Sequence, residues 1–251
     1  MYGEDRIRRD AAGASFALFR PVKTVSVSND AGDDIVPFAI AEVSSKPYCV
    51  IFPLRFSRSA RLYREQNPEI PVIILEGRYP ENENPSGFAL GANTLEYFIY
   101  KTDIESDFYR AAAAANAIDK GKSGKIVVFY DKDMPQARDA FLRGLYEQGN
   151  LLETMFLVSF SQYSESGELS CVIMAGSGHE FFERRTGTPV FMFSWLSPNY
   201  LPNDVVLVIN DSPWVQVKQA VKLLSAGERT GLIKSKFQYL DRRAFGRGLL
   251  P

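Results

Sequence analysis

The sequence predicts an α/β protein of two lobes, each built on a parallel β-sheet, that are joined by a hinge. Short β-branched runs alternate with amphipathic segments along most of the chain, which is typical of parallel sheets with helical crossovers. Several runs, such as residues 71–75, are continuously apolar, as strands covered on both faces are. Residues 103–118 separate two such series. Their acidic start and five consecutive alanines predict a strong helix at the passage between the lobes.

This pattern divides the chain into three segments. We expect an N-terminal α/β lobe over residues 1–103 and a C-terminal α/β lobe over residues 104–204. Residues 205–251 are expected to form a return crossover strand, a helix and a tail that pack across the hinge.

In the first half, each predicted element follows from hydrophobic spacing and from the residues that end it. Apolar residues at helical spacing predict helices at residues 5–19, 33–45 and 57–66. Alternating or continuous apolar runs predict strands at residues 23–28, 48–52, 71–75 and 95–100. Residues 79–92 are rich in Pro, Asn, Glu and Gly, and they predict a loop long enough to form a rim.

The second half repeats the same alternation. Strands are predicted at residues 125–130, 153–160, 169–174, 189–194 and 205–209. Helices are predicted at residues 135–148, 179–185 and 214–224. In parallel sheets of this kind, ligands bind outside the carboxyl ends of the strands.

The composition excludes several classes of protein. With 29 basic and 30 acidic residues the net charge is −1, so no long-range field attracts nucleic acid or an anionic membrane. One histidine and two cysteines without a CxxC motif leave a zinc site without ligands. No apolar run reaches the ~18 residues of a membrane span. We expect no metal, no cofactor and no nucleic-acid binding by this chain alone, with Cys49 and Cys171 as buried thiols in different lobes.

Three local sequences resemble the type I periplasmic-binding-protein fold, the two-lobed family of sugar and nucleoside receptors. Residues 103–117 resemble its first interlobe crossover, and residues 124–145 resemble the opening strand and helix of its second lobe. The most specific likeness spans residues 189–227, which resemble the last ligand-lining strand, the return crossover and the packing helix with its C-terminal glycine.

The resemblance implies a non-enzymatic receptor that closes two lobes around a polar solute such as a sugar or nucleoside. The resemblance further implies ABC-type uptake or sensing, with a transporter permease or a sensor as the expected partner. If a signal segment has been removed, the resemblance implies a periplasmic protein or a membrane-anchored lipoprotein, and otherwise a cytoplasmic one.

The chain departs from the family at its start. Family members open with an apolar strand at the centre of the first sheet, whereas this chain is expected to start in the helix that follows, without that first strand. Either an upstream segment is absent, or residues 14–19 form that strand.

The predicted strand ends carry groups suited to a small polar ligand, because aromatic rings can stack on it while carboxylates, amides and Arg take its polar edge. Asn210 matches the hinge position that often contacts ligand in the resembled family. The candidate ligand-binding residues are Asn29, Asp30, Arg55, Phe56, Glu76, Arg78, Asp103, Tyr130, Asp131, Arg138, Ser161, Ser177, His179, Ser194, Trp195 and Asn210.

Two other functions remain as alternatives. Asp131 and Asp133 after an apolar strand resemble the nucleophile strand of Mg²⁺-dependent haloacid-dehalogenase-like phosphatases, although Met134 stands where threonine or valine is usual. The chain also resembles the ligand-binding domain of a transcription regulator, which shares the fold. A Ser/His hydrolase is rejected, because the glycines around Ser177 lack the spacing of a nucleophile elbow.

Overall fold

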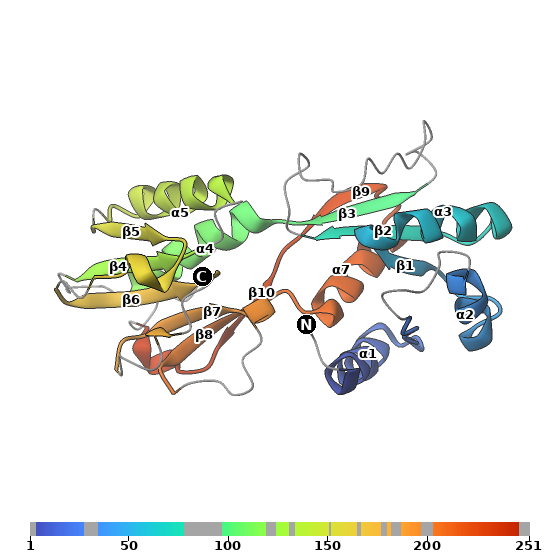
Figure 1. The fold of residues 1–251 in the computed structure, drawn as a ribbon, viewed down its shortest axis with the longest axis horizontal. Coiled ribbons are helices and arrows are strands. Elements are labelled where there is room, and N and C mark those ends of the chain that lie inside the picture. Colours follow the sequence, from blue (N-terminus) through green and yellow to red (C-terminus); the bar gives the residue numbers. More distant parts are fainter. Residues whose placement is uncertain are drawn as a thin grey trace. The chain divides into compact units, whose positions relative to one another are not determined.

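The structure is a computed structural model that describes residues 4–27, 35–77, 97–118, 124–130, 134–150, 152–164, 167–176, 180–181, 187–196 and 203–245. The chain forms two compact units (Figure 1). The N-terminal unit comprises Tyr2–Thr102 and Ser212–Ile233, and the C-terminal unit comprises Asp103–Asp211 and Lys234–Pro251. The chain therefore passes between the units three times, after Thr102, Asp211 and Ile233.

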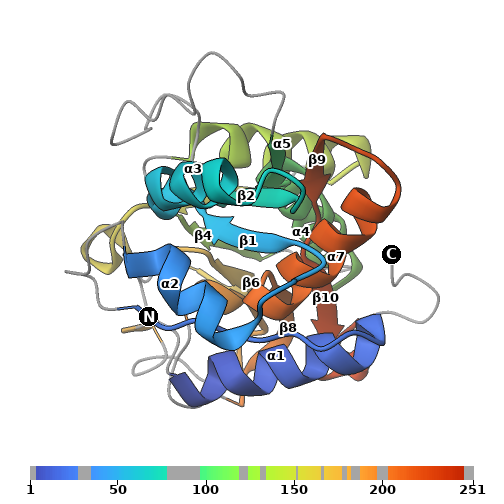
Figure 2. The same cartoon turned by 90° about the vertical axis from the view of Figure 1, so that its right-hand side faces the viewer.

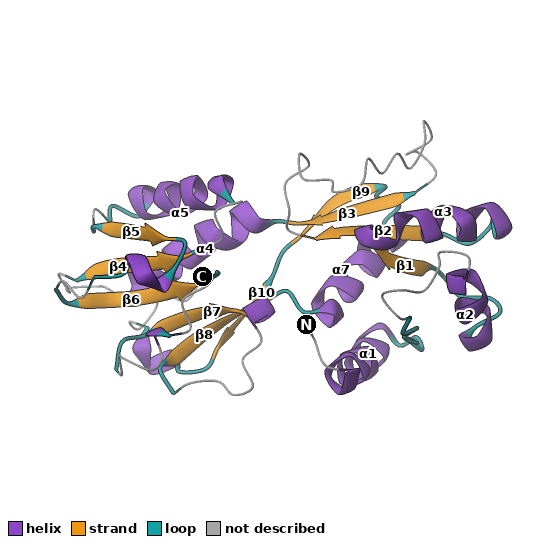
Figure 3. Cartoon of the chain, viewed as in Figure 1, coloured by secondary structure: helices purple, strands orange, loops and turns teal. Residues whose placement is uncertain are grey.

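The N-terminal unit is built on a four-stranded sheet whose strands all run parallel in the order β1-β2-β3-β9 (Figure 3). The strands are β1 (Val50–Pro53), β2 (Val72–Gly77), β3 (Phe98–Thr102) and β9 (Thr230–Ile233). The helices are α1 (Glu4–Leu18), α2 (Ile35–Val43), α3 (Ser57–Gln66) and α7 (Pro213–Ser225), with a short 3₁₀ turn, η1 (Leu54–Phe56), between β1 and α3.

Both faces of this sheet are covered by apolar side chains. On one face, Val72 and Ile74 of β2 pack with residues of α2 and α3, such as Ile40 and Tyr63. On the other face, Ile73 packs with residues of α7. Alternate residues of β2 face opposite layers, and both layers are apolar. This explains why the sequence of β2 is apolar throughout, as predicted for a strand covered on both faces.

Helix α1 lies against α7 (Figure 2). A methyl group added to Gly13 of α1 would come within 3.0 Å of the indole Nε1 of Trp214, so the glycine leaves room for this ring. The indole is half-buried in that contact, and the Lys218 ammonium lies 4.9 Å from the ring centre. Trp214 is therefore a packing residue of the N-terminal unit.

The C-terminal unit is built on a six-stranded sheet in the order β10-β8-β7-β6-β4-β5. All neighbours are parallel except β10, which runs antiparallel to β8. The strands are β4 (Lys125–Phe129), β5 (Thr154–Leu157), β6 (Leu169–Met174), β7 (Val190–Phe193), β8 (Val205–Asn210) and β10 (Lys236–Tyr239). The other elements are α4 (Ile104–Ile118), α5 (Pro135–Glu147) and the 3₁₀ turns η4 (Phe160–Gln162), η5 (Ser194–Leu196) and η6 (Arg242–Ala244).

Helices α4 and α5 pack closely against each other and onto one face of this sheet (Figure 1). The alanines of α4 explain the short distance: a methyl group added to Gly144 of α5 would lie 2.9 Å from Cβ of Ala112 and 2.8 Å from the carbonyl oxygen of Tyr109. The stripe of small residues in the sequence thus predicts a real close approach. The opposite face of the sheet is covered by aromatic rings that include Phe160 and Phe181.

Most predicted elements are confirmed with small shifts at their ends, which is the usual uncertainty of boundaries. One strand is wrong: residues 23–27 form no strand, although Val25 and Val27 pack against the core of the N-terminal unit. The alternation therefore identified the side chains that pack inward, which are partly buried, but these residues have no partner strand. Strands β9 and β10 were not predicted, because their sequences are short and mix glycine, lysine and glutamine with apolar residues.

The described residues decide one further sequence expectation. Residues 14–18 are helical, so the alternative that residues 14–19 form a first strand is wrong. The segment at residues 205–251 is divided between the units, since β8 and β10 belong to the C-terminal unit while α7 and β9 belong to the N-terminal unit. The predicted loop at 79–92 and most of the helix predicted at 179–185 lie outside the described residues.

No helix that the structure describes is long and apolar enough to cross a membrane.

Candidate functional site

Two candidate residues lie at the carboxyl edge of the N-terminal sheet. Pro53 of β1 pairs with Leu75 of β2, so Phe56, just after β1, and Glu76, at the end of β2, belong to the same edge. Both side chains are half-buried, and the Phe56 ring packs against the core under α3. This edge therefore presents a ring and a carboxylate close to the positions where ligands of parallel sheets bind.

The carboxyl edge of the C-terminal sheet carries more of the candidates. Phe193 pairs with Ile209, so Ser194 and Asn210 are neighbours at the ends of β7 and β8. Tyr130 follows β4 and meets the Phe156 ring edge-on, with ring centres 5.7 Å apart.

Arg138 and Ser161 also belong to the C-terminal unit. The exposed Arg138 side chain lies over the Phe156 ring, 5.4 Å from its centre. Ser161 is exposed in the turn after β5, and its hydroxyl is 2.6 Å from that of Ser159. The structure thus brings Ser194 and Asn210 together, and it places Tyr130, Arg138 and Ser161 around Phe156 and the end of β5.

Other candidates cannot be placed. The residues Asn29, Asp30, Arg78, Asp131, Ser177 and His179 lie outside the described residues, and so does Asp133. For Arg55 and Trp195 only the backbone is described, in η1 and η5.

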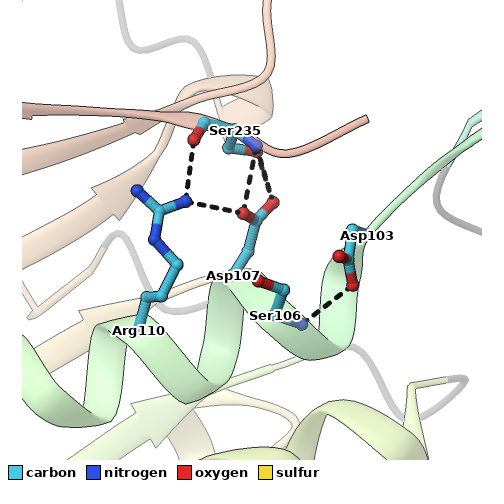
Figure 4. Close-up of polar contacts among 5 residues, drawn as sticks. All are labelled: Asp103, Ser106, Asp107, Arg110 and Ser235. Carbon is cyan, nitrogen blue, oxygen red and sulfur yellow. Dashed lines mark hydrogen bonds and ion pairs between the residues drawn. The ribbon is translucent and has the colours of Figure 1, made fainter. Parts of the chain in front are cut away.

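Asp103 has a structural role at the first passage between the units. Its Oδ1 accepts a hydrogen bond of 3.0 Å from the backbone N–H of Ser106 and so caps the N-terminus of α4 (Figure 4). A carboxylate is favoured there because the first turn of a helix carries unpaired N–H groups and a partial positive charge.

One turn further along α4, Asp107 is fully buried and binds the third passage. The backbone N–H of Ser235 donates to both carboxylate oxygens, at 3.0 and 3.3 Å, and its hydroxyl donates to Oδ2. Figure 4 shows Asp107 extending from α4 towards Ser235, with Arg110 beside it. An Arg110 NH1 nitrogen lies 3.5 Å from Oδ1 and also donates to the carbonyl oxygen of Ser235 at 3.0 Å.

The electrostatics of this cluster are dominated by desolvation. Burial raises the pKa of Asp107 to about 7, against the opposing effects of the Ser235 hydrogen bonds and the Arg110 charge. The Arg110 guanidinium is itself one-third exposed and stacks on the Phe237 ring, 4.0 Å from its centre. The Arg110 guanidinium group therefore contacts water, the Phe237 ring, the Asp107 carboxylate and the Ser235 carbonyl oxygen. Its positive charge only partly compensates the buried negative charge of Asp107.

The second passage is held by another Ser/Asp pair. The buried Ser194 hydroxyl donates to Oδ1 of Asp211 at 2.6 Å, and the backbone N–H of Asp211 donates back to the same hydroxyl oxygen at 3.0 Å. Each of the three passages thus reaches the C-terminal unit at an Asp/Ser hydrogen-bonded pair. In this conformation the Ser194 hydroxyl is engaged with Asp211.

Sequence reasoning missed Asp107, Arg110, Asp211 and Ser235. Helical spacing could have indicated Asp107, since it lies on the same face of α4 as the buried Ala111 and Ala114. An acidic side chain on an apolar face needs a partner. That partner, Ser235, is 128 residues away, and only the tertiary structure brings it there.

Among the residues that the structure describes, no group of three or more His, Cys, Asp or Glu side chains is arranged to hold a metal ion.

Comparison with solved structures shows the fold. Over 93% of this chain and 91% of the other, the chain superposes with a TM-score of 0.54 on an ABC transporter periplasmic solute-binding protein from Actinobacillus succinogenes, solved with bound D-allose, at 13% sequence identity. This confirms the two-lobed periplasmic-binding-protein-like α/β fold predicted from the sequence.

Two other structures are similar at lower scores. A glucose-galactose-binding protein from Geobacillus stearothermophilus gives a TM-score of 0.48 at 14% identity, covering 93% of this chain and 91% of that one. A putative LacI transcriptional regulator from Bacteroides fragilis gives 0.45 at 11% identity, covering 93% and 90%. Comparison with protein families finds no match, and neither does comparison with curated proteins.

Proposed function

We propose that this protein is a solute receptor whose two units close around a small polar ligand such as a sugar or nucleoside, for ABC-type uptake or sensing. The observation that carries the proposal is the placing of polar and aromatic side chains at the carboxyl edge of each parallel sheet, with Phe56 and Glu76 in one unit and Tyr130 and Asn210 in the other. The fold is shared with a solute-binding protein that holds D-allose.

The proposed binding set comprises the residues named from the sequence. Its physical logic is that rings cover the faces of a ligand while carboxylates, amides and guanidinium groups take its hydroxyl and amide edges. An ABC permease or a sensor as partner, and a periplasmic location, are parts of the same proposal. Turnover is not, because a receptor of this kind works by domain closure alone.

A thermal-shift screen against sugars, nucleosides and small amides tests the proposal. A ligand present at one hundred times its Kd should stabilise the folded protein by roughly 2.7 kcal/mol. Small-angle scattering with that ligand should then show a smaller radius of gyration. A stabilising ligand that leaves the radius of gyration unchanged would contradict closure.

The two tryptophans give a matched pair of variants. Trp195 follows β7 at the proposed site, so Trp195→Ala should weaken ligand binding by about 1–3 kcal/mol, as expected for the loss of a stacked ring, with the unfolding midpoint of the free protein nearly unchanged. The Trp214 ring packs against Gly13, so Trp214→Ala should lower the midpoint and leave the affinity unchanged. The reverse result would mean that the site has been put in the wrong place.

A phosphatase assay separates the proposal from its enzymatic alternative. If the protein hydrolyses p-nitrophenyl phosphate in a Mg²⁺-dependent reaction and Asp131→Asn abolishes this activity, the proposal that the protein is a receptor is wrong. No hydrolysis is expected.

A further inference from the structure

We propose that Asp107 acts as a proton-sensitive latch on the third segment that joins the two units: with a proton bound it holds Ser235 against α4, and when the proton is lost to solvent this hold loosens. The inference concerns the free protein and does not depend on which ligand it binds.

The contact between Asp107 and Ser235 lies on the segment that links the two units. Ile233 ends β9 in the N-terminal unit, and Ser235, two residues later, is bound to α4 of the C-terminal unit through its N–H and its hydroxyl. Ser235 and Asp107 are 4% and 0% exposed, so each covers the other. In this arrangement water does not reach the carboxyl group, and movement of the segment around Ser235 away from α4 would expose it.

A neutral carboxyl group can keep both contacts. Its carbonyl oxygen accepts from the Ser235 N–H, while its own O–H donates to the Ser235 hydroxyl oxygen, which can turn to accept. An ionised carboxylate gains stronger hydrogen bonds but must give up its hydration. With a pKa of about 7 for Asp107, desolvation exceeds the favourable contacts, and the buried arrangement is the one that prefers the proton.

The charged and titratable groups around Asp107 do not reverse its preference for the protonated form. Arg110 on the same helix lowers the pKa, and Asp103 one turn earlier raises it. On the connecting segment, Lys234 and Lys236 are both exposed. On β10, the partly buried Tyr239 has a raised pKa from burial and interacts with Arg110, so it stays neutral at every acidic and neutral pH.

The linkage has a definite sign. The pKa of the Asp107 carboxyl group is 3.8 in water and about 7 when Ser235 is bound to it, so low pH favours the bound arrangement. The population in which Ser235 is released from α4 should rise about tenfold for each pH unit between roughly pH 5 and 6.5. It should level off above pH 7, where the carboxyl group is ionised in both arrangements.

Hydrogen exchange at the Ser235 amide tests the latch in the full chain without ligand. The protection factor, already corrected for the intrinsic exchange rate, should fall by about tenfold per pH unit from pH 5 to 6.5. In Asp107→Asn it should be independent of pH, since the amide keeps an acceptor for the N–H but cannot titrate. Asp139→Asn, exposed on α5, is the matched control and should keep the wild-type profile.

A second variant keeps the test decisive if Asp107→Asn does not fold. Ser235→Ala removes one hydrogen bond that lowers the pKa of Asp107, so the carboxyl titration followed by carbon-13 NMR should move to higher pH and the exchange profile should follow it. Protection at Ser235 that does not change with pH in the wild type, or that changes equally in Asp107→Asn, would overturn the proposal. So would a carboxyl group at Asp107 that titrates near pH 4.

Discussion

Asp107 is a fully buried carboxyl group whose hydrogen bonds to Ser235 and ion pair with Arg110 only partly offset the loss of hydration, and its effect on stability follows from that. The folded-state pKa of about 7 lies above the unfolded value of 3.8, so the stability that protonation gives is fully present below about pH 4 and is lost as pH rises to 7. At 1.36 kcal/mol per pKa unit, ionisation costs on the order of 4 kcal/mol above pH 7.

Replacing this carboxyl group should therefore stabilise the protein at neutral and alkaline pH. In Asp107→Asn the urea midpoint at pH 8 should exceed that of the wild type, and the difference should shrink towards pH 4. Asp139→Asn should reproduce the wild-type dependence on pH. A variant that is destabilised equally at both pH values would show that the carboxylate contacts outweigh the burial cost.

Phe19 is a second residue whose local chemistry conflicts with its position. It has a φ of +50° just after α1, where the Arg20 N–H bonds to the Ser15 carbonyl oxygen and the Phe19 N–H to that of Phe16. These are the two bonds of a Schellman motif, whose left-handed residue is usually glycine. The Phe19 side chain is 91% exposed, so little burial offsets the strain.

Phe19→Gly should raise the stability of the N-terminal unit by about 1 kcal/mol, because glycine adopts the left-handed region without steric cost. The measurement is the chemical denaturation midpoint. Phe19→Ala keeps a Cβ and should give little of this gain. If alanine and glycine stabilise equally, the exposed ring rather than the backbone is responsible.

At the level of elements, the contact between α4 and α5 depends on small residues, Gly144 on α5 and Ala112 on α4. Gly144→Ala would improve the helix propensity of α5 by up to about 1 kcal/mol. The added methyl group, however, would meet the Tyr109 carbonyl oxygen at 2.8 Å and Ala112 Cβ at 2.9 Å. Both are fixed atoms of the neighbouring helix, so the helices must separate.

We therefore expect Gly144→Ala to destabilise the protein by roughly 1–3 kcal/mol, the usual cost of overpacking. Asp139→Ala, at an exposed position of the same helix, adds no atom to the contact and should leave the midpoint nearly unchanged. A stabilised Gly144→Ala would show that α4 and α5 can move apart freely.

For the whole molecule, the three passages mean that the N-terminal unit is not a continuous segment. Its sheet core joins Ile73 and Tyr100 to Ala220, Leu224 and Ile233, which come from α7 and β9. The Tyr100 hydroxyl also donates to the carbonyl oxygen of Glu228 at 2.8 Å. A fragment that ends at residue 102 lacks one cover of the sheet and one strand.

A polypeptide of residues 1–102 should therefore have little fixed structure by circular dichroism and should unfold without a cooperative transition. Addition of a peptide of residues 212–233 should restore helix and strand signal. Cooperative unfolding of the fragment alone would contradict the division of the chain into these two units.

The cysteines provide a chemical test at the same scale. Cys49 and Cys171 belong to different units and both are thiols rather than disulfide partners, as the sequence predicted, but only Cys171 is fully buried, whereas Cys49 is partly exposed. Titration under denaturing, non-reducing conditions should find two thiols. In the native protein Cys49 should alkylate slowly at pH 7, since burial raises its pKa to about 11 and the thiolate is the reactive form.

Local patterns in the sequence were enough to predict most of the elements and the fold class, because these depend on spacing along the chain. The alternation of apolar runs with amphipathic helices is visible within windows of roughly 5 to 15 residues. Strands such as β6 and helices such as α3 were predicted at their observed bounds. The five consecutive alanines of α4 likewise predicted a helix that the structure confirms.

Strand pairing and the meeting of polar groups, in contrast, depend on the tertiary structure. Val25 and Val27 alternate like a strand but have no strand partner, while residues 236–239, which mix polar and aromatic side chains, form β10 by pairing antiparallel with β8. Of the candidate site residues, strand order brought Ser194 beside Asn210, whereas the bond between Asp107 and Ser235 joins positions 128 residues apart. Local propensity carries no information about such long-range pairs, because their energy comes from burial and hydrogen bonds that exist only after the chain has folded.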